Sequence, residues 1–237
     1  MNISYKPFDR ATADRTGIPL LVNGDRMGQA EFHQRYKAYP RHVKFELIGG
    51  TVYMASPVRM THGRYDEELA YLFKTYSNAT PGVESAGNTT TILGEESEPQ
   101  PDRFLRILSE YGGRSKVDAE DYLTGPPELL AEVAYSTRAI DLHQKRDDYE
   151  RAGVLEYLVV CVEEPELHWF HFASGGLITP NRQGVCCSQV FPGLWIHQQA
   201  LLQRDSACLE TVLRQGLASR AHAGFVKRLE KARKRKT

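Results

Sequence analysis

Apolar and polar positions alternate along the chain in patterns that predict short strands and helices. Residues 44–48 and 51–55 are strand-like runs on either side of Gly49 and Gly50, and such a two-glycine turn is a strong β-hairpin signal. Between residues 62 and 76, large apolar and aromatic side chains recur at spacings of three and four, which predicts a helix with one buried face. We therefore expect a hairpin followed by a core-packed helix.

Three further apolar runs predict strands in the middle of the chain. They cover residues 83–93, 104–108 and 129–134, and an acidic loop at 94–98 follows the first. A polar connection that contains glycine, residues 111–127, separates the second run from the third. Connections of this length are uncommon within compact domains and are often functional, so we expect this one to face the substrate.

The next segment predicts a helix between two strands. Ser136-Thr137 can cap a helix over 138–152, and Gly153 stands at the usual stop position. Residues 155–162 and 167–172 then form two strand-like runs separated by a short turn. A strand, a helix and another strand in succession are typical of an α/β arrangement.

The remaining segments predict extensions around this core. A short helix is expected at 28–38, edge strands within 177–196, and one or two helices within 208–231. The fold class is thus α/β (α+β), with a core and two extensions. We expect an N-terminal extension with a short helix at residues 1–40, a core domain at 41–200 and a helical C-terminal extension at 201–237.

Composition limits the possible settings of the protein. The chain has 237 residues, of which 41% are hydrophobic, and this is enough for a substantial core. Its longest apolar run, 157–162, is far too short to span a bilayer, and the N-terminus shows no signal-peptide apolar region. The four cysteines show no CxxC pairing and no zinc-site spacing, so we assign them no chemistry. We expect a cytoplasmic protein that does not enter a membrane.

The charge balance conceals a basic C-terminus. The whole chain has 30 basic and 30 acidic residues, but residues 225–237 contain seven basic residues and one acidic residue. Such a tail could contact phosphates, with an affinity that falls as salt rises. No aromatic residue follows Phe225 to stack on bases, and this favours a solvated terminus as the simpler interpretation.

Two carboxylates interrupt predicted core strands. Asp102 follows Pro101 at the start of the 104–108 run, and Glu132 lies inside the 129–134 run on the same strand face as apolar residues. A buried carboxylate is strongly penalised unless it is paired, protonated or bound to a metal. Asp102 alone could be a turn residue and Glu132 alone a buried ion pair, but together they suggest a functional site.

A lysine on the following predicted helix could reach these acids. Asp141, Lys145 and Tyr149 recur every four residues and therefore share one helix face. A surface salt bridge is the simplest explanation of one lysine, but Tyr149 is unusual in a solvated stripe. This polar face is expected to turn inward toward Asp102 and Glu132.

The order and spacing of these residues resemble a known family. The chain is similar to the bacterial putative restriction-endonuclease-like proteins of the PD-(D/E)XK nuclease superfamily, from about residue 44 to residue 172. The resemblance rests on Phe45-Glu46-Leu47-Ile48-Gly49-Gly50, His62, Pro101-Asp102, Glu132-Val133, and Asp141-x3-Lys145-x3-Tyr149-x3-Gly153-Val154-x-Glu156-Tyr157.

The resemblance implies a restriction-endonuclease-like core, in which helices flank a mixed central β-sheet. A standard acid-x-lysine motif would place lysine at position 134, where this chain has Ala134. In this branch of the superfamily the lysine is understood to lie on the next helix, which Lys145 matches. Catalytic roles are thereby implied for Asp102, Glu132, Lys145 and Glu46.

Metal-assisted hydrolysis of DNA phosphodiester bonds is the activity that the resemblance implies. Asp102 and Glu132 are hard oxygen ligands suited to Mg²⁺ or Mn²⁺, which would activate a water. Lys145 would orient that water and neutralise developing charge. His62 and Tyr149 are expected to support the site, and a homodimer would suit the cutting of two strands.

Two alternatives remain at this point. The first is a nuclease fold without catalysis, which would serve as a nucleic-acid-binding or assembly module. The second is a glycosidase with paired carboxylates, which would need no lysine. Metal-dependent cleavage that is suppressed by Asp102→Ala, Glu132→Ala and Lys145→Ala would distinguish the nuclease from both.

Overall fold

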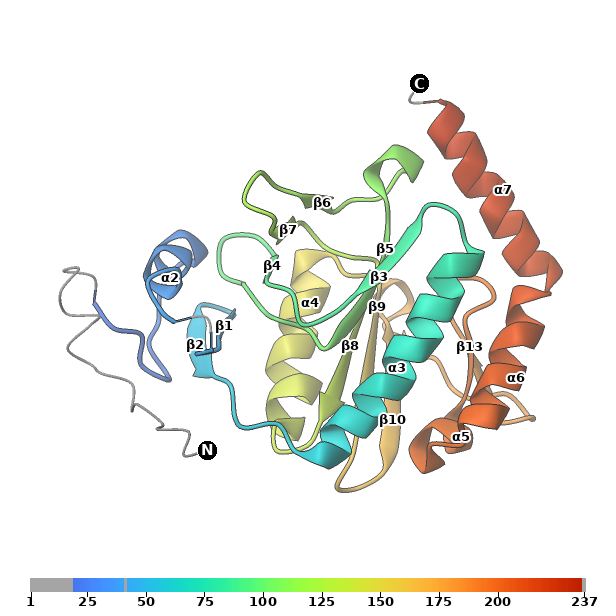
Figure 1. The fold of residues 1–237 in the computed structure, drawn as a ribbon, viewed down its shortest axis with the longest axis horizontal. Coiled ribbons are helices and arrows are strands. Elements are labelled where there is room, and N and C mark those ends of the chain that lie inside the picture. The colour runs from blue at the N-terminus through green and yellow to red at the C-terminus, as the bar shows by residue number, and fades with distance from the viewer. Residues whose placement is uncertain (1–18, 41, 236–237) are drawn as a thin grey trace, which may run out of the picture.

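A mixed β-sheet runs through the centre of the protein (Figure 1). The structure is a computed structural model that describes residues 19–40 and 42–235. Within this part of the chain the largest sheet has six strands in the order β11-β10-β9-β8-β5-β3. The strands are β3 (Val83–Ala86), β5 (Arg103–Ile107), β8 (Leu129–Ala134), β9 (Glu156–Cys161), β10 (Glu166–His171) and β11 (Gly176–Leu177).

The two central strands explain the architecture of this sheet. Every residue of β8 and β9 is buried, as expected for apolar runs that are covered on both faces. They pair in parallel, with Glu132 opposite Val159, and the other pairs in this sheet are antiparallel. A parallel pair needs a crossover, which is supplied by a π-helical turn, η2 (Ile140–Lys145), and the helix α4 (Arg146–Ala152). The α/β (α+β) prediction is confirmed.

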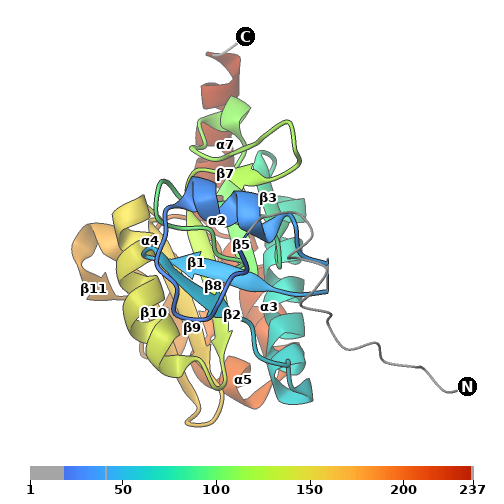
Figure 2. The same ribbon diagram turned by 90° about the vertical axis from the view of Figure 1, so that its left-hand side faces the viewer.

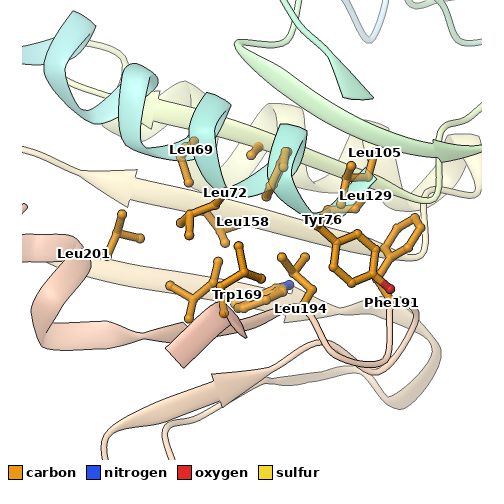
Figure 3. Close-up of a cluster of buried hydrophobic side chains, with 14 of the residues drawn as sticks. Leu69, Leu72, Tyr76, Leu105, Leu129, Leu158, Trp169, Phe191, Leu194 and Leu201 are labelled. Carbon is orange, nitrogen blue, oxygen red and sulfur yellow. The ribbon is translucent and has the colours of Figure 1, made fainter. Parts of the chain in front are cut away.

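One face of the sheet packs against α3 (Met60–Ala79) and the C-terminal helices. Leu69, Leu72 and Tyr76 of α3 meet Leu129 and other sheet residues in this core, as Figure 3 shows. The C-terminal helices are α5 (Gln198–Gln203), α6 (Ser206–Leu217) and α7 (Arg220–Lys234), and each contributes buried residues to the same cluster. The predicted buried helix at 62–76 is confirmed and is longer at both ends.

The opposite face of the sheet packs against α4. Tyr149 of α4 lies in a second core cluster with Phe104, Leu130 and Tyr157. A small sheet of β4 (Thr91–Ile92), β7 (Leu123–Thr124) and β6 (Lys116–Val117) extends this layer, and Leu93 and Leu123 join the cluster. Side chains at even positions of β8 face this layer, so Glu132 points toward α4, as the strand alternation predicts.

An N-terminal unit packs beside this body (Figure 2). It consists of α2 (Gln29–Tyr36) and a hairpin of β1 (Phe45–Ile48) and β2 (Thr51–Met54), around its own apolar cluster. Gly49 and Gly50 have φ of +54° and +73°, the left-handed conformation that a two-residue hairpin turn requires. The predicted hairpin and short helix are confirmed, and residues 1–18 of the predicted N-terminal extension lie outside the described residues.

The predicted strand at 83–93 is wrong as a single element. It divides into β3 and β4, which belong to different sheets. The break occurs at Gly87, where a Cβ atom would lie 2.0 Å from the carbonyl oxygen of Asp102, and at Asn88, which has φ of 55°. The chain bends here because the backbone that leads to Asp102 passes against it.

The long connection at 111–127 lies away from the candidate site. It joins the end of β5 to the start of β8 and forms η1 (Ser109–Tyr111), β6 and β7. Asp102 and Glu132 lie toward the opposite ends of these strands, because β5 and β8 are antiparallel. The expectation that this connection faces the substrate is therefore wrong for the pocket described below, which none of its residues lines.

The segment after β10 adds short strands to the fold. Edge strands are found where expected, as β11 and as the separate pair β12 (Val185–Cys187) and β13 (Trp195–His197). Lys236 and Thr237, the end of the predicted basic tail, lie outside the described residues. Within residues 19–40 and 42–235, no helix combines the length and apolar character needed to cross a bilayer.

Candidate active site

Asp102 and Glu132 meet where β5 and β8 lie side by side. Arg103 of β5 pairs with Ala131 of β8, so one step further the backbone amide of Asp102 faces Glu132 and donates to its Oε2 at 3.3 Å. In return, the amide of Val133 donates to Asp102 Oδ2 at 2.8 Å. Antiparallel pairing thus brings together two acids that lie thirty positions apart in the sequence.

Lys145 reaches these acids from the crossover. Its Nζ lies 2.9 Å from Glu132 Oε1 and 3.1 Å from Glu46, and it is 3.8 Å from Asp141. Residues 140–145 form a π-helical turn instead of the uniform α-helix expected for 138–152, and Thr137 donates to Asp141 Oδ2 at 2.5 Å instead of capping the helix. Such turns are frequent at functional sites. The polar helix face does turn inward as predicted.

Tyr149 completes the contacts of Glu132. Its hydroxyl donates to Glu132 Oε1 at 2.9 Å, and its ring is fully buried against Tyr157 with the ring centres 5.0 Å apart. The same carboxylate oxygen therefore accepts from a lysine and a tyrosine on consecutive turns of one helix. This arrangement fixes the orientation of Glu132.

Glu46 comes to the site from the N-terminal hairpin. It lies on β1, and its carboxylate accepts a hydrogen bond from the backbone N–H of Gln100 at 2.7 Å in addition to its contact with Lys145. The side chain of Gln100 also donates to the Tyr36 hydroxyl at 2.7 Å. These bonds hold the hairpin against the segment that leads into Asp102.

His62 lies at the start of α3 and contacts the other acid. Its Nε2 is 3.1 Å from Asp102 Oδ2. This hydrogen bond raises the pKa of His62 above its usual value. Burial alone would raise the pKa of Asp102, but the hydrogen bond and charge of His62 outweigh it, and the Asp102 pKa is lowered. The pair is therefore ionic over part of the acidic range.

The site brings together more acidic than basic side chains. Burial raises the pKa of Glu132 well above its usual value, opposed by Lys145 and reinforced by Asp102, Asp141 and Glu46. Burial also disfavours the charged form of Lys145, but these carboxylates outweigh it and raise the Lys145 pKa well above the usual value. Lys145 is thus held protonated, and the surplus of acids favours the binding of an additional cation.

These groups line one pocket of about 160 Å³, which all four predicted catalytic residues and His62 reach. Its acids offer hard oxygen donors of the kind that Mg²⁺ prefers. No group of three His, Cys, Asp or Glu residues within the described ranges has a spacing suited to one metal ion. Mg²⁺ commonly uses one or two carboxylates and completes its shell with water, so the adjacent carboxylates of Asp102 and Glu132 fit this chemistry.

The sequence interpretation missed two contributors to the site. Asp141 lies 2% exposed beside Lys145 and lines the pocket, and its place in the Asp141-Lys145-Tyr149 stripe was the available signal. Gln100 lines the same pocket, but nothing in the sequence around Pro101 distinguishes it from a loop residue. All six predicted residues, including His62 and Tyr149, converge in space.

Comparison with known proteins identifies the fold and the family of the chain. The chain resembles in fold a crystal structure described as a putative nuclease belonging to DUF820 from Anabaena variabilis ATCC 29413, with a TM-score of 0.53, 12% sequence identity, and coverage of 72% of this chain and 96% of that one. No curated protein matches the chain. The family model described as "Putative restriction endonuclease" (Uma2) matches residues 30–204. The chain therefore belongs to the Uma2 family.

Proposed function

We propose that the protein is an endonuclease that hydrolyses phosphodiester bonds in DNA with the help of Mg²⁺ or Mn²⁺. The observation behind this proposal is the convergence of Lys145 with Glu132 and Asp102, from the crossover and two adjacent strands, in one pocket. A lysine beside two carboxylates is the constellation that the resemblance to the PD-(D/E)XK superfamily implies. Membership of a family described as "Putative restriction endonuclease" supports the same conclusion.

Asp102 and Glu132 would hold the metal ion. Among the residues that the structure describes, Glu132 Oε2 accepts only the 3.3 Å contact from the Asp102 backbone amide, whereas its Oε1 accepts from both Lys145 and Tyr149. Asp102 Oδ2 is bonded to His62 and Val133. Each acid is thus oriented through one oxygen. When bound, the metal supplies Lewis-acid activation of water and of a phosphate oxygen.

The other residues act on charge and protons. Lys145, kept protonated by the surrounding acids, would neutralise negative charge that develops on the scissile phosphate. Glu46 is 3.1 Å from the same ammonium and would orient the attacking water. His62 would contact phosphate or assist proton transfer, and Tyr149 would hold Glu132 in place.

The test is cleavage of supercoiled plasmid with Mg²⁺ or Mn²⁺ and in EDTA. We expect nicking only with the metal, and its loss in Asp102→Asn and Glu132→Gln. Glu128→Gln is the matched control, because Glu128 is equally buried just before β8 but does not line the pocket. Cleavage in EDTA, or equal cleavage by all these proteins, would refute the proposal.

One observation favours a second candidate, a catalytically inactive nucleic-acid-binding module. Lys145 already bridges Glu132 and Glu46, and no three-ligand group stands ready for a metal among the described residues. DNA binding by the wild type without metal-dependent cleavage would support this candidate. The glycosidase alternative has no comparable support, because Lys145 pairs with Glu132 and Glu46 in the pocket, and a two-carboxylate glycosidase needs no lysine there.

The domain boundaries and the oligomeric state also remain proposals. We propose residues 41–200 as the nuclease unit, with residues 1–40 and 201–237 as extensions. We also propose a homodimer in the cytoplasm, since two active sites would cut both strands of a duplex. Analytical ultracentrifugation of the whole chain would test the dimer.

A further inference from the structure

An exposed apolar segment lies at the mouth of the pocket. Residues 54–60 join β2 to α3, and Figure 1 shows this connection bridging the hairpin and the lower end of the long helix. Met54, Val58 and Met60 are 54%, 72% and 71% exposed, and they are among the most exposed large apolar residues of the described chain. Exposed apolar residues gathered in one short segment usually mark a contact surface.

Two cations stand beside this segment. Lys44 and Arg59 are exposed, both line the pocket, and neither forms an ion pair with a carboxylate in the described ranges. Arg59 lies over the ring of Tyr135, 5.0 Å from its centre, and donates to its hydroxyl at 3.3 Å. Lys145 differs from them, because carboxylates neutralise its charge. The charges of Lys44 and Arg59 are therefore available to an anionic partner.

The start of α3 adds to this positive character. Arg59 is the N-cap of this 20-residue helix, and its side chain makes no capping hydrogen bond. The first amide groups of α3 thus lie uncapped next to the two cations. Lys44 and residues 54–60 therefore form a rim that is positive and apolar, beside a pocket floor that is acidic.

The acids of the pocket floor are more buried than this rim. The side chains of Glu132, Lys145 and Asp102 are 5%, 7% and 14% exposed, whereas the residues of the 54–60 segment are exposed. A phosphodiester that reaches the acids past this rim would bring its neighbouring nucleotides against Lys44, Arg59 and the apolar side chains. Cations suit the flanking phosphates, and Met, Pro and Val side chains can wedge against base steps.

We infer that Lys44, Arg59 and the 54–60 segment form the surface that binds DNA next to the cleaved bond. The two cations bind phosphates, and Met54, Pro57, Val58 and Met60 contact bases. This inference rests on the proposed function, because it takes the pocket as the place of cleavage. It also assigns the DNA contact to the β2–α3 connection and not to the basic C-terminal tail.

Binding of a short fluorescent duplex, measured by anisotropy in EDTA over a range of salt concentrations, tests this assignment without cleavage. In Lys44→Ala/Arg59→Ala we expect roughly tenfold weaker binding and a salt slope smaller by about 2, one for each lost phosphate contact. In Val58→Ser/Met60→Ser we expect weaker binding with an unchanged slope. Arg182→Ala, which removes an exposed cation that does not line the pocket, should change neither.

Several outcomes would overturn the inference. The first is that the Lys44/Arg59 variant binds with the affinity and salt slope of the wild type. The second is that Arg182→Ala weakens binding as much as the Lys44/Arg59 variant does. The third is that the Val58/Met60 variant binds DNA normally and differs only in its self-association, measured by sedimentation. In the last case the apolar patch would bind a second copy of the chain and not DNA. If the wild type cleaves but these variants bind normally, the inference fails and the proposed function stands. If binding depends on Lys44 and Arg59 but no metal supports cleavage, the proposed function fails instead.

Discussion

Two buried glutamates on neighbouring strands differ in the groups that surround their carboxylates. Glu132 on β8 and Glu156 on β9 are 4% and 0% exposed, in the same parallel strand pair. Glu156 accepts from the Gln189 and Val190 amides at 2.6 and 3.0 Å, and from the Ser188 hydroxyl and the Trp169 indole at 2.7 and 3.2 Å. It thereby fastens the C-terminal segment to the sheet.

Glu132 has a different set of partners. It contacts the Lys145 ammonium and the Tyr149 hydroxyl, lies near other acids and borders a pocket. Burial raises the pKa of both glutamates, so neither burial nor the shift separates them. The difference is that neutral donors form hydrogen bonds with both carboxylate oxygens of Glu156. Glu132, in contrast, has one weakly bonded oxygen and borders a pocket that contains other charged groups.

The largest expected effect concerns Lys145. Lys145→Met keeps the length of the side chain but removes the charge, and we expect plasmid cleavage to fall about a thousandfold, as when an electrostatic stabiliser of the transition state is lost. Initial nicking rates with saturating Mg²⁺ would measure this. Lys116→Met, on exposed β6, is the control. Cleavage within tenfold of the wild type would remove Lys145 from the chemistry.

The next effect should appear in stability and concerns Glu156. Glu156→Gln offers one acceptor oxygen to four donors, so at least two donors lose their partner, and we expect the free energy of unfolding to fall by about 3 kcal/mol. Cleavage per folded molecule should not change, since Glu156 does not line the pocket. Urea unfolding and nicking assays on the same preparation would measure both. Lost cleavage with unchanged stability would reverse the roles of the two glutamates.

Two buried tyrosines sharpen the comparison further. Tyr149→Phe removes the hydrogen bond to Glu132, and we expect cleavage to fall about tenfold with a change in stability of roughly 1 kcal/mol. Tyr157→Phe is the matched control, because the Tyr157 hydroxyl is buried without a hydrogen-bond partner among the described residues. Tyr157→Phe should leave the cleavage rate unchanged, and the free energy of unfolding should stay the same or increase. Equal effects of the two substitutions on cleavage would show that Tyr149 acts only through packing.

The smallest effect is the pH dependence of the His62–Asp102 pair. The His62 pKa is raised, so its contribution to stability is complete below about pH 6.5 and is lost as pH rises through the raised pKa. The Asp102 pKa is lowered, so its contribution is lost as pH falls through that lowered pKa. We therefore expect His62→Gln to cost about 1 kcal/mol near pH 5.5 and less near pH 8.5.

Urea unfolding of both proteins at the two pH values would measure this difference. Tyr157→Phe serves as the comparison, because burial raises the pKa of the Tyr157 hydroxyl well above its usual value, and this hydroxyl has no hydrogen-bond partner among the described residues. A cost of His62→Gln that is the same at both pH values would show that the pair is not ionic.

The sequence predicted the elements whose causes are local. The hairpin at 45–54 follows from two glycines that adopt positive φ, and α3 follows from a repeating apolar face. The strand break at Gly87 was not predicted, because it arises from contact with the Asp102 carbonyl, fifteen positions away in the sequence. The π-helical turn at 140–145 was missed for a similar reason, since its side chains are held by β1 and β8.

The candidate site shows the same division. The cost of burying Glu132 was a sound argument, but it applies equally to Glu156, to which the sequence interpretation assigned no role. The spacing of Asp141, Lys145 and Tyr149 was enough to place them on one face, and the structure buries that whole face. Asp141 was left unassigned because one acid in a charged stripe is indistinguishable from a surface salt bridge.

By itself, the sequence determined which residues share a face of the clearly periodic strands and helices, because alternation and helical periodicity depend on neighbours in the chain. It also determined the family, through the order of short motifs. Only the tertiary structure decided which buried acid meets a lysine and which meets neutral donors. That choice depends on strand pairing, on the crossover that brings Lys145 over β8, and on the N-terminal hairpin that carries Glu46 to the pocket. These contacts join residues from about thirteen to one hundred positions apart, a range that no local pattern encodes.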